Sequence, residues 1–383
     1  AYSARDERGL TLIGFAAFLD PPKDSAARAL SELHRYGISV KVLTGDNELV
    51  TRKVCRDVGM PVRGVLLGAD VEKMSEAELG EAAERTDIFA KLSPSHKERI
   101  VSALRKRGHS VGFMGDGIND APALKASDVG ISVESAADIA KESSSIVLME
   151  RSLLVIKDGV AEGRRVFGNI DKYIRMAASS NFGNMFSVIG ASIFLPFLPM
   201  LPLQVLVNNL LYDMSQATIP SDNVDKEWIE KPRKWSVETI KKFILYMGPV
   251  SSLFDFTTFF ILIFMFNALA DPALFRTGWF VESLLTQTLI IHIIRTNKIP
   301  FLQSTASARL VVSSIIISIV GVALPFSPIA PYLGLVPLPP AFLIVLAATL
   351  LAYFALANIL KGRIFRPSEA VGSKSTSAPA GVQ

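Results

Sequence analysis

The chain contains a single cysteine, Cys55, among its 383 residues. One cysteine cannot form an intramolecular disulfide, so we expect no disulfide framework, and this cysteine usage fits a reducing compartment. The first seven residues are polar, and we expect no secretory signal peptide. The net charge is a modest +4, and no basic face interleaved with aromatic residues is present, so no nucleic-acid partner is expected.

The hydrophobic residues are unevenly distributed, although they make up 50% of the chain. Residues 1–170 are rich in Lys, Arg, Asp and Glu, as is typical of a soluble domain. Residues 173–360 contain repeated long apolar stretches with few charges. We therefore predict an integral membrane protein with a cytosolic domain.

Short apolar runs alternate with helical patterns in the first part of the chain. We expect strands at 10–19, 38–43, 64–67, 88–92, 110–114, 129–133 and 145–149, and helices at 25–36, 47–58, 75–85, 95–106 and through Leu124. This alternation predicts an α/β fold over residues 1–157, with a doubly wound parallel sheet that binds ligands at the carboxyl ends of its strands. Residues 158–172 are polar and helical, and we interpret them as a stalk.

Six apolar segments follow, each near the ~20 residues needed to cross the hydrocarbon core. We predict a transmembrane domain over 173–366, with helices at about 173–197, 201–220, 243–268, 279–296, 309–327 and 338–360. Lys and Arg gather after the second, fourth and sixth spans, whereas the other loops carry only Arg276. This asymmetry places both termini of the chain and the α/β domain in the cytosol. Residues 367–383, rich in Ser, Ala, Pro and Gly, are expected to be a disordered tail.

A pair of carboxylates follows the expected strand over 110–114. Asp116 and Asp120 lie in the string Gly-Asp-Gly-Ile-Asn-Asp, which continues with Ala-Pro-Ala-Leu. Two carboxylates at the carboxyl end of a strand are a natural site for Mg²⁺, which prefers oxygen ligands. Gly115 and Gly117 allow the backbone to approach a phosphate closely. Gly-Asp-Gly alone is also an ordinary turn, but the longer string is far more specific.

Two further segments stand where such a sheet would bind a phosphate. Thr44, Gly45 and Asp46 directly follow an expected strand, and the hydroxyl and glycine amide can hold a phosphoryl oxygen. The alternative interpretation of this turn is a helix N-cap. Lys97 lies in the first turn of the expected helix over 95–106 and can neutralise a transferred phosphoryl group, although a solvated surface lysine is the alternative.

Polar residues within the first two expected spans are candidate ion ligands. Asn181 and Asn184 share one helical face, as do Asn209 and Asp213, and facing helices could offer amide and carboxylate oxygens to one cation. Asp213, which we place near mid-span, would cost roughly 2.5–3.5 kcal/mol on insertion scales if unpaired. A bound cation would offset that cost.

Other polar residues in the spans favour structural interpretations. We expect Ser180 and Asn208 to form interhelical hydrogen bonds. We expect Asp255, Glu282 and His292 to lie near the membrane interfaces, where they serve structural or snorkelling roles.

The order of these segments resembles the P-type ATPases of the haloacid-dehalogenase superfamily. The matching strings are Leu19-Asp20-Pro21-Pro22, Leu43-Thr44-Gly45-Asp46-Asn47, Pro94-Ser95-His96-Lys97 and the string from Gly115 to Leu124. The resemblance covers nearly the whole chain up to the tail. It implies ATP as substrate and a catalytic Mg²⁺ that neutralises charge in phosphoryl transfer. The site residues that it implies are Asp116 and Asp120 at the Mg²⁺, Asn119 as an organising residue, and Thr44, Gly45, Asp46 and Lys97 at the phosphoryl group.

The membrane part is most similar to the bacterial magnesium-transporting P-type ATPases. The resemblance rests on the strings over 208–216, 219–225, 231–235, 279–281 and 286–290. It implies import of Mg²⁺ across a bacterial inner membrane, with Asn181, Asn184, Asn209 and Asp213 as ligands of the transported ion. One carboxylate among amides suits a single divalent ion that remains partly hydrated, because Mg²⁺ gives up its water reluctantly.

The chain departs from the family pattern in one large respect. It contains neither the Asp-Lys-Thr-Gly string that carries the phosphorylated aspartate nor the Thr-Gly-Glu string of the actuator domain. The nucleotide-binding domain and the first four membrane helices have no counterpart here either. The resemblance therefore implies the carboxyl-terminal portion of a pump, whose amino-terminal part is its partner and which does not form the aspartyl-phosphate by itself.

Three alternatives remain open at this point. The first is a related pump for Ca²⁺ or another cation. The second is a membrane-anchored phosphatase, for which Asp20 is the only candidate nucleophile. The third is an inactive fragment or a subunit completed by a separate chain.

Overall fold

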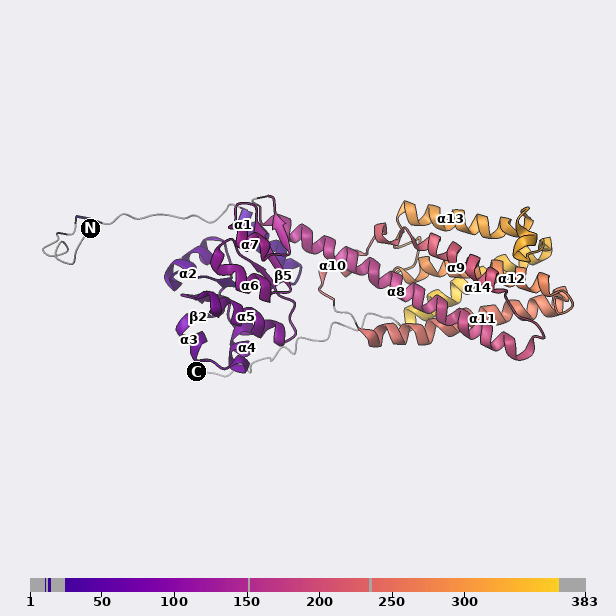
Figure 1. Ribbon diagram of the computed structural model, residues 1–383, viewed down its shortest axis with the longest axis horizontal. Helices are drawn as coiled ribbons and strands as arrows, with labels where there is room; N and C mark the ends of the chain where they lie inside the picture. The colour runs from indigo at the N-terminus through magenta and orange to yellow at the C-terminus, as the bar shows by residue number, and fades with distance from the viewer. Residues whose placement is uncertain (1–10, 12, 15–24, 151, 234–235, 365–383) are drawn as a thin grey trace, which may run out of the picture. The chain divides into compact units, whose positions relative to one another are not determined.

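The computed structural model describes residues 11, 13–14, 25–150, 152–233 and 236–364. Asp20, the tail over 367–383 and most of the strand expected over 10–19 lie outside these residues. The chain divides into two compact units, Ala1–Val160 and Ala161–Gln383, each with its own hydrophobic clusters (Figure 1).

The first unit is an α/β domain, drawn from indigo to magenta in Figure 1. Its helices are α1 (Ser25–Arg35), α2 (Glu48–Asp57), α3 (Gly68–Lys73), α4 (Glu76–Arg85), α5 (Pro94–Lys106), a 3-10 turn (Ile118–Asp120), α6 (Ala121–Ala126) and α7 (Asp138–Glu142). Its strands are β1 (Val42–Leu43), β2 (Val65–Leu67), β3 (Ile88–Ala90), β4 (Gly112–Met114), β5 (Val129–Val133) and β6 (Ile146–Leu148). Each strand falls within or beside a predicted run, whereas α3 and α7 were not expected.

The strands of the described residues form two three-stranded parallel sheets, in the orders β1-β3-β2 and β4-β5-β6. The predicted parallel α/β architecture is thus confirmed. Within the described residues, β1 pairs only with β3 and β4 pairs only with β5, so no hydrogen bonds join the two sheets. Leu43 and Val111 each pack against two hydrophobic clusters, one of which contains Phe89 of β3 and the other Phe113 of β4, so the cores of the two sheets are continuous.

Two helices of this unit, α4 and α5, begin after a serine N-cap. Ser75 accepts a bond from the amide of Glu78, and the Glu78 carboxylate accepts one from the Ser75 amide at 2.9 Å, which confirms a capping box readable from the sequence. Ser93 is the N-cap residue of α5, as Ser75 is of α4, and Pro94 occupies the first turn of α5. This start places Lys97 in the first turn of α5, as predicted.

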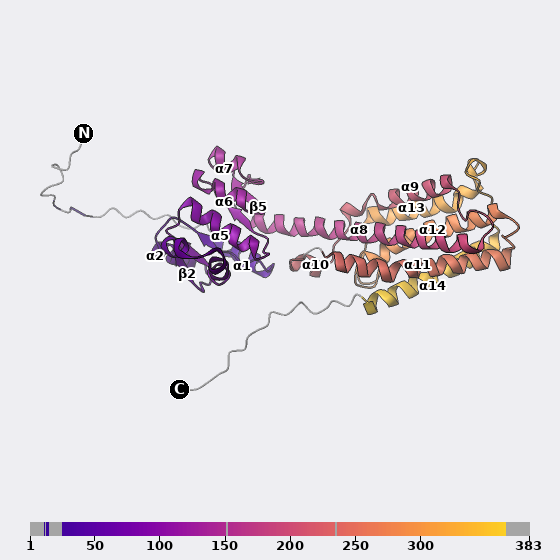
Figure 2. The ribbon, with the colours of Figure 1, turned by 60° about the horizontal axis from the view of Figure 1, so that its bottom comes forward.

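The second unit is a bundle of helices with short connecting turns, and Figure 2 shows its helices from a second side. They are α8 (Leu154–Phe194), α9 (Pro202–Gln216), α10 (Lys226–Glu230), α11 (Val237–Phe266), α12 (Pro272–Ile294), α13 (Ala308–Ala323) and α14 (Pro340–Ile364), with 3-10 turns at Ile219–Ser221, Leu324–Phe326 and Ala330–Leu333. Helix α8 runs without a break from the predicted stalk into the first predicted span.

Helix α12 is the central element of the bundle. It contacts α9, α11, α13 and α14, and most of its residues are buried. A helix that is apolar on most sides is stable only when other helices or lipid cover it, and here other helices do so. Trp279 and Phe280 anchor it in one hydrophobic cluster, and Leu284 anchors it in another. The buried polar residues of α12 are consequently held inside the bundle.

Four helices of the described residues are long and apolar enough to cross a membrane: Ile240–Phe266, Pro272–Ile294, Ala308–Phe326 and Pro340–Arg363. The predicted span over 279–296 begins seven residues too late, because Asp271 caps α12 and Pro272 occupies its first turn. The first two predicted spans are helical as α8 and α9, but they do not meet the same criterion of length and composition.

A buried cluster of charges joins three parts of the bundle. The carboxylate of Asp222 accepts hydrogen bonds from Lys172 Nζ of α8 at 2.8 Å and from Arg295 Nε at the end of α12 at 2.9 Å. All three side chains are buried. Burial opposes ionisation of Asp222, but the charges of Lys172 and Arg295 outweigh burial and hold its pKa below the ordinary value.

Candidate functional site

The turn after β1 is closed by its own side chains. Thr44 Oγ1 donates to Asp46 Oδ2 at 2.8 Å and accepts from the Asp46 amide at 3.1 Å. Asn47, not Thr44 or Asp46, caps α2 through a bond from the Leu49 amide. Gly45 and Asp46 are exposed at the carboxyl end of β1. The N-cap interpretation of Thr44 is therefore wrong, and its hydroxyl stands at the strand end where a phosphate would bind.

The structure brings Lys97 and Asp120 together. Lys97 Nζ lies 2.7 Å from Asp120 Oδ1, and Asp120 is only 7% exposed. Asp120 Oδ2 also accepts from the Gly117 amide at 3.2 Å. Lys97 is accordingly not a solvated surface lysine, because its ammonium is held by a buried carboxylate. Both carboxylate oxygens of Asp120 accept hydrogen bonds, so this residue fixes the loop and positions the ammonium of Lys97.

Asp116 is the exposed carboxylate of the same loop. Its main-chain oxygen accepts from the Ala137 amide at 2.9 Å, which anchors the loop while its side chain stays exposed. A side chain at Gly115 would meet the Cβ of Asp120 at 2.5 Å, so only glycine permits this packing. Asn119 is also exposed. The exposed carboxylate of Asp116 suits a hard cation such as Mg²⁺, and the half-buried ammonium of Lys97 suits the phosphoryl oxygens that such a cation would bridge.

We expect Lys97→Ala in the complete pump to reduce phosphoryl transfer by about 100-fold or more, because removal of one preorganised electrostatic contact costs roughly 10²–10³ in rate. The measurement is the rate of phosphoenzyme formation from labelled ATP. Lys125→Ala is the matched control, because this lysine of α6 is exposed. Equal rates in the two variants would contradict the role of Lys97.

In the second unit, hydrogen bonds connect Asn184, one of the predicted ion ligands, to α12. Asn184 Oδ1 accepts from Gln287 Nε2 at 3.4 Å. Gln287 Nε2 also lies 3.3 Å from Asn208 Oδ1, and its Oε1 accepts from Ser180 at 2.9 Å. Asn208 in turn donates to the main-chain oxygen of Phe280. The predicted interhelical bonding of Ser180 and Asn208 is thus confirmed, and Gln287 is the residue that connects them.

The remaining predicted ion ligands are not gathered in one contact. Asn181 and Asp213 are exposed and Asn209 is half-buried. Asp213 lies in the last turn of α9, not at mid-helix, because α9 ends at Gln216. Within the described residues, Asp213 has no hydrogen-bond or ion-pair partner, and no group of three His, Cys, Asp or Glu side chains is close enough to hold a metal.

Asp255 of α11 and Glu282 and His292 of α12 are buried inside the bundle, so the predicted snorkelling role is wrong and the structural role fits them. Their position near the membrane interfaces stays a prediction. Asp255 bonds Trp279 and Ser187, and His292 bonds Ser314 at 3.0 Å. Their sequence neighbours are apolar in the same way as those of a lipid-exposed helix, so the sequence alone carried no signal of burial.

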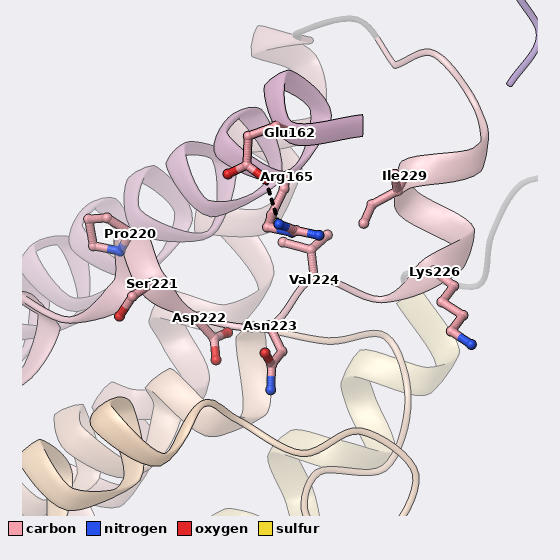
Figure 3. Close-up of a pocket in the computed structure, with 9 residues that line it drawn as sticks. All are labelled: Glu162, Arg165, Pro220, Ser221, Asp222, Asn223, Val224, Lys226 and Ile229. Atoms are coloured by element: carbon pink, nitrogen blue, oxygen red, sulfur yellow. Dashed lines mark hydrogen bonds and ion pairs between the residues drawn. The ribbon is translucent and has the colours of Figure 1, made fainter. Parts of the chain in front are cut away.

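A cavity of about 530 Å³ opens in the second unit beside the Asp222 loop. Figure 3 shows its lining, in which Glu162 and Arg165 of α8 form an ion pair facing Val224. Asp222 borders the cavity, but its carboxylate is bonded to Lys172 and Arg295. The pocket contains none of the candidate ligands from the sequence.

Comparisons with known proteins connect both units to one family. The family described as haloacid dehalogenase-like hydrolase matches residues 3–128, and the family described as cation transporting ATPase, C-terminus, matches residues 197–363. A "Magnesium-transporting ATPase, P-type 1" of Escherichia coli (strain K12) is 54% identical over 363 residues, which is 94% of this chain. The chain is a member of the P-type cation-transporting ATPases.

Two further relatives are similar to nearly all or part of the chain. A "Magnesium-transporting ATPase, P-type 1" of Salmonella typhimurium (strain LT2) is 53% identical over 94% of the chain. A "Calcium-transporting ATPase" of Bacillus subtilis (strain 168) is 36% identical over 54% of the chain and 24% of its own length. The chain spans about 40% of the length of the magnesium-transporting relatives.

Proposed function

We propose that the chain is the carboxyl-terminal part of an ATP-driven Mg²⁺ pump. In the complete protein, ATP hydrolysis through an aspartyl-phosphate would drive import of Mg²⁺ across the bacterial inner membrane. The observation that carries this proposal is the loop after β4, where the exposed Asp116 stands beside the buried Lys97–Asp120 pair. Such an arrangement supports phosphoryl transfer by charge neutralisation, with Mg²⁺ as cofactor.

The unpaired edges of β1 and β4 support a missing central element. Both strands end at candidate phosphate-binding residues, Thr44 after β1 and Asp116 after β4, and each pairs on one side only within the described residues. An unpaired edge at the centre of a domain invites another strand. We infer that a strand outside the described residues completes the sheet, and that the phosphorylated aspartate reaches the site from the amino-terminal part of the pump.

Mg²⁺ is proposed as the transported ion because of the similarity to magnesium-transporting relatives over 94% of the chain. Asn184 lies at the Gln287 network of amide oxygens. Asn181, Asn209 and Asp213 would complete the ligand set when the rest of the pump covers their exposed faces. Amides with one carboxylate suit a partly hydrated Mg²⁺. The proposal includes six membrane helices in this chain and cytosolic positions for both of its ends.

We expect Asp213→Asn in the complete pump to reduce Mg²⁺ uptake by at least about tenfold, because the substitution removes the only carboxylate from the proposed ligand set; 1.4 kcal/mol of lost binding is already tenfold. Uptake into cells that lack other Mg²⁺ transporters is the measurement, and the melting temperature of the purified variant checks its fold. Glu238→Gln is the control, because its side chain is 68% exposed. Uptake at the level of this control would exclude Asp213 as a ligand. Uptake of Ca²⁺ in place of Mg²⁺ by the unmodified pump would favour the calcium alternative.

A further inference from the structure

Two carboxyl groups meet inside the bundle, away from the candidate ion ligands. Asp255 of α11 is 3% exposed and Glu282 of α12 is 0% exposed. They lie on packed neighbouring helices, and Asp255 bonds Trp279, which lies one turn before Glu282 on the same face of α12. Burial of carboxyl groups within a membrane span is expensive unless a partner or a proton compensates their charge.

Both carboxylate oxygens of Asp255 accept hydrogen bonds, whereas those of Glu282 accept none. Asp255 Oδ1 accepts from Trp279 Nε1 at 3.0 Å, and its Oδ2 accepts from the Ser187 hydroxyl of α8. Glu282 is fully buried, yet neither of its oxygens has a partner that could donate a hydrogen bond to an ionised carboxylate. No ion pair to either residue occurs among the described side chains. The other titratable group near the pair is Tyr353 of α14, whose hydroxyl is bonded to Ser251 at 2.9 Å.

These contacts favour a proton over a metal ion. Both oxygens of Asp255 already accept from protein donors, so a cation would find free oxygens only on Glu282. Mg²⁺ requires near-octahedral coordination by oxygen, and two oxygens of one side chain do not supply it. Two ionised carboxylates can only accept hydrogen bonds, and contact between them without a proton is repulsive. A proton on Glu282 turns the same contact into a hydrogen bond donated to Asp255.

We propose that Asp255 and Glu282 form a proton-binding site that is separate from the candidate cation ligands and holds one exchangeable proton at neutral pH. Uptake of one proton from water changes the charge of the pair from −2 to −1, and release reverses the change. No other bond is made or broken.

Contacts of α8 link the pair to the candidate cation ligand Asn184, which lies on that helix. Ser187, which bonds Asp255, lies one turn after Asn184 on α8. Ser283, the residue next to Glu282 on α12, lies 3.4 Å from Asn184 Oδ1. A shift of α8 against α12 when a cation binds would therefore alter the Asp255–Glu282 contact. This step rests on the proposed pump function: we infer that the pair releases its proton when the cation binds, and that the pump carries the proton in the direction opposite to the cation.

The test uses the purified complete pump and infrared difference spectroscopy. We expect a carbonyl band of a protonated carboxylic acid at pH 7, where an ordinary glutamic acid, with a pKa of about 4.3, is ionised. The band should be lost in Glu282→Gln, shifted in frequency in Asp255→Asn, which replaces the acceptor of the proton's hydrogen bond, and unchanged in Glu238→Gln, which alters an exposed carboxylate. Addition of Mg²⁺ should release protons to a pH-sensitive dye from the unmodified pump, and this release should be lost in Glu282→Gln.

A carbonyl band that is absent from the unmodified pump at pH 7 would overturn the proposal. This measurement does not require the variants to fold. A band of unchanged intensity in folded Glu282→Gln would overturn it as well. Failure of the proposed transport function gives a different pattern, because the band and its loss in Glu282→Gln would remain while Mg²⁺ released no protons.

Discussion

Replacement of Asp116 by Asn in the complete pump is expected to reduce aspartyl-phosphate formation by about 10²–10³-fold. Asp116 is the exposed carboxylate of the loop after β4, whereas Asp120 is already bonded to Lys97 and to the Gly117 amide. An amide keeps the shape of the side chain but removes the charge that attracts Mg²⁺. The metal would then bind weakly, and the phosphoryl group would lose its main source of charge neutralisation.

The measurement is phosphoenzyme formed from labelled ATP over a range of Mg²⁺ concentrations. Asp138→Asn is the control, because that carboxylate lies in the same unit and its side chain is 90% exposed. A higher Mg²⁺ concentration should partly restore phosphoenzyme formation in Asp116→Asn, because the substitution lowers the affinity for the metal. A normal phosphoenzyme level at low Mg²⁺ would rule out Asp116 as the ligand.

The second large effect is expected at Asp222. Asp222→Ala removes the carboxylate between Lys172 and Arg295 and leaves two buried cations uncompensated. The loss of one partner from a buried ion pair costs about 3–5 kcal/mol, and here the Ser307 amide also loses its acceptor, which lies at 2.9 Å. We expect a clear fall in the melting temperature of the detergent-solubilised protein.

Glu227→Ala is the matched control for Asp222. Glu227 pairs with Lys298 at 2.8 Å, but its side chain is 63% exposed, so the expected cost is about 0–1 kcal/mol. The Asp222 contribution also depends on pH. Because its folded pKa lies below the ordinary value, the stabilisation is present above about pH 4 and is lost as the pH falls through the folded pKa. A melting temperature of Asp222→Ala equal to that of the control would refute this account of the cluster.

The geometry of the loop after β4 could be predicted because it is local. Gly115, Asp116 and Asp120 lie within one turn, and the close approach of Gly115 to Asp120 follows from the order of residues. The helix that carries Lys97 was predictable for the same reason, since Ser93 and Pro94 are a start signal written in the sequence. The pairing of Lys97 with Asp120 was not predicted, because 23 residues separate them in the sequence.

The membrane unit was predicted less completely. Apolar length identified the helices, but the start of α12 was missed although Asp271 and Pro272 are a recognisable cap. The burial of polar side chains inside the bundle was also misjudged. A span that faces lipid and one that faces other helices have similar apolar composition, so hydropathy does not distinguish them. Asp213 and Glu282 show this, since the first is exposed in the structure and the second is fully buried.

The sequence by itself determined the class of the protein, the order of its two parts and the local form of the loop after β4, because each depends on periodicity or on contacts within a few residues. Only the tertiary structure decided which polar groups meet in the bundle. The Asp222 cluster joins residues from α8, a loop and α12, and the Asp255–Glu282 pair joins two helices. Such contacts depend on the rotation and depth at which helices pack, and these follow from the fit of all side chains together.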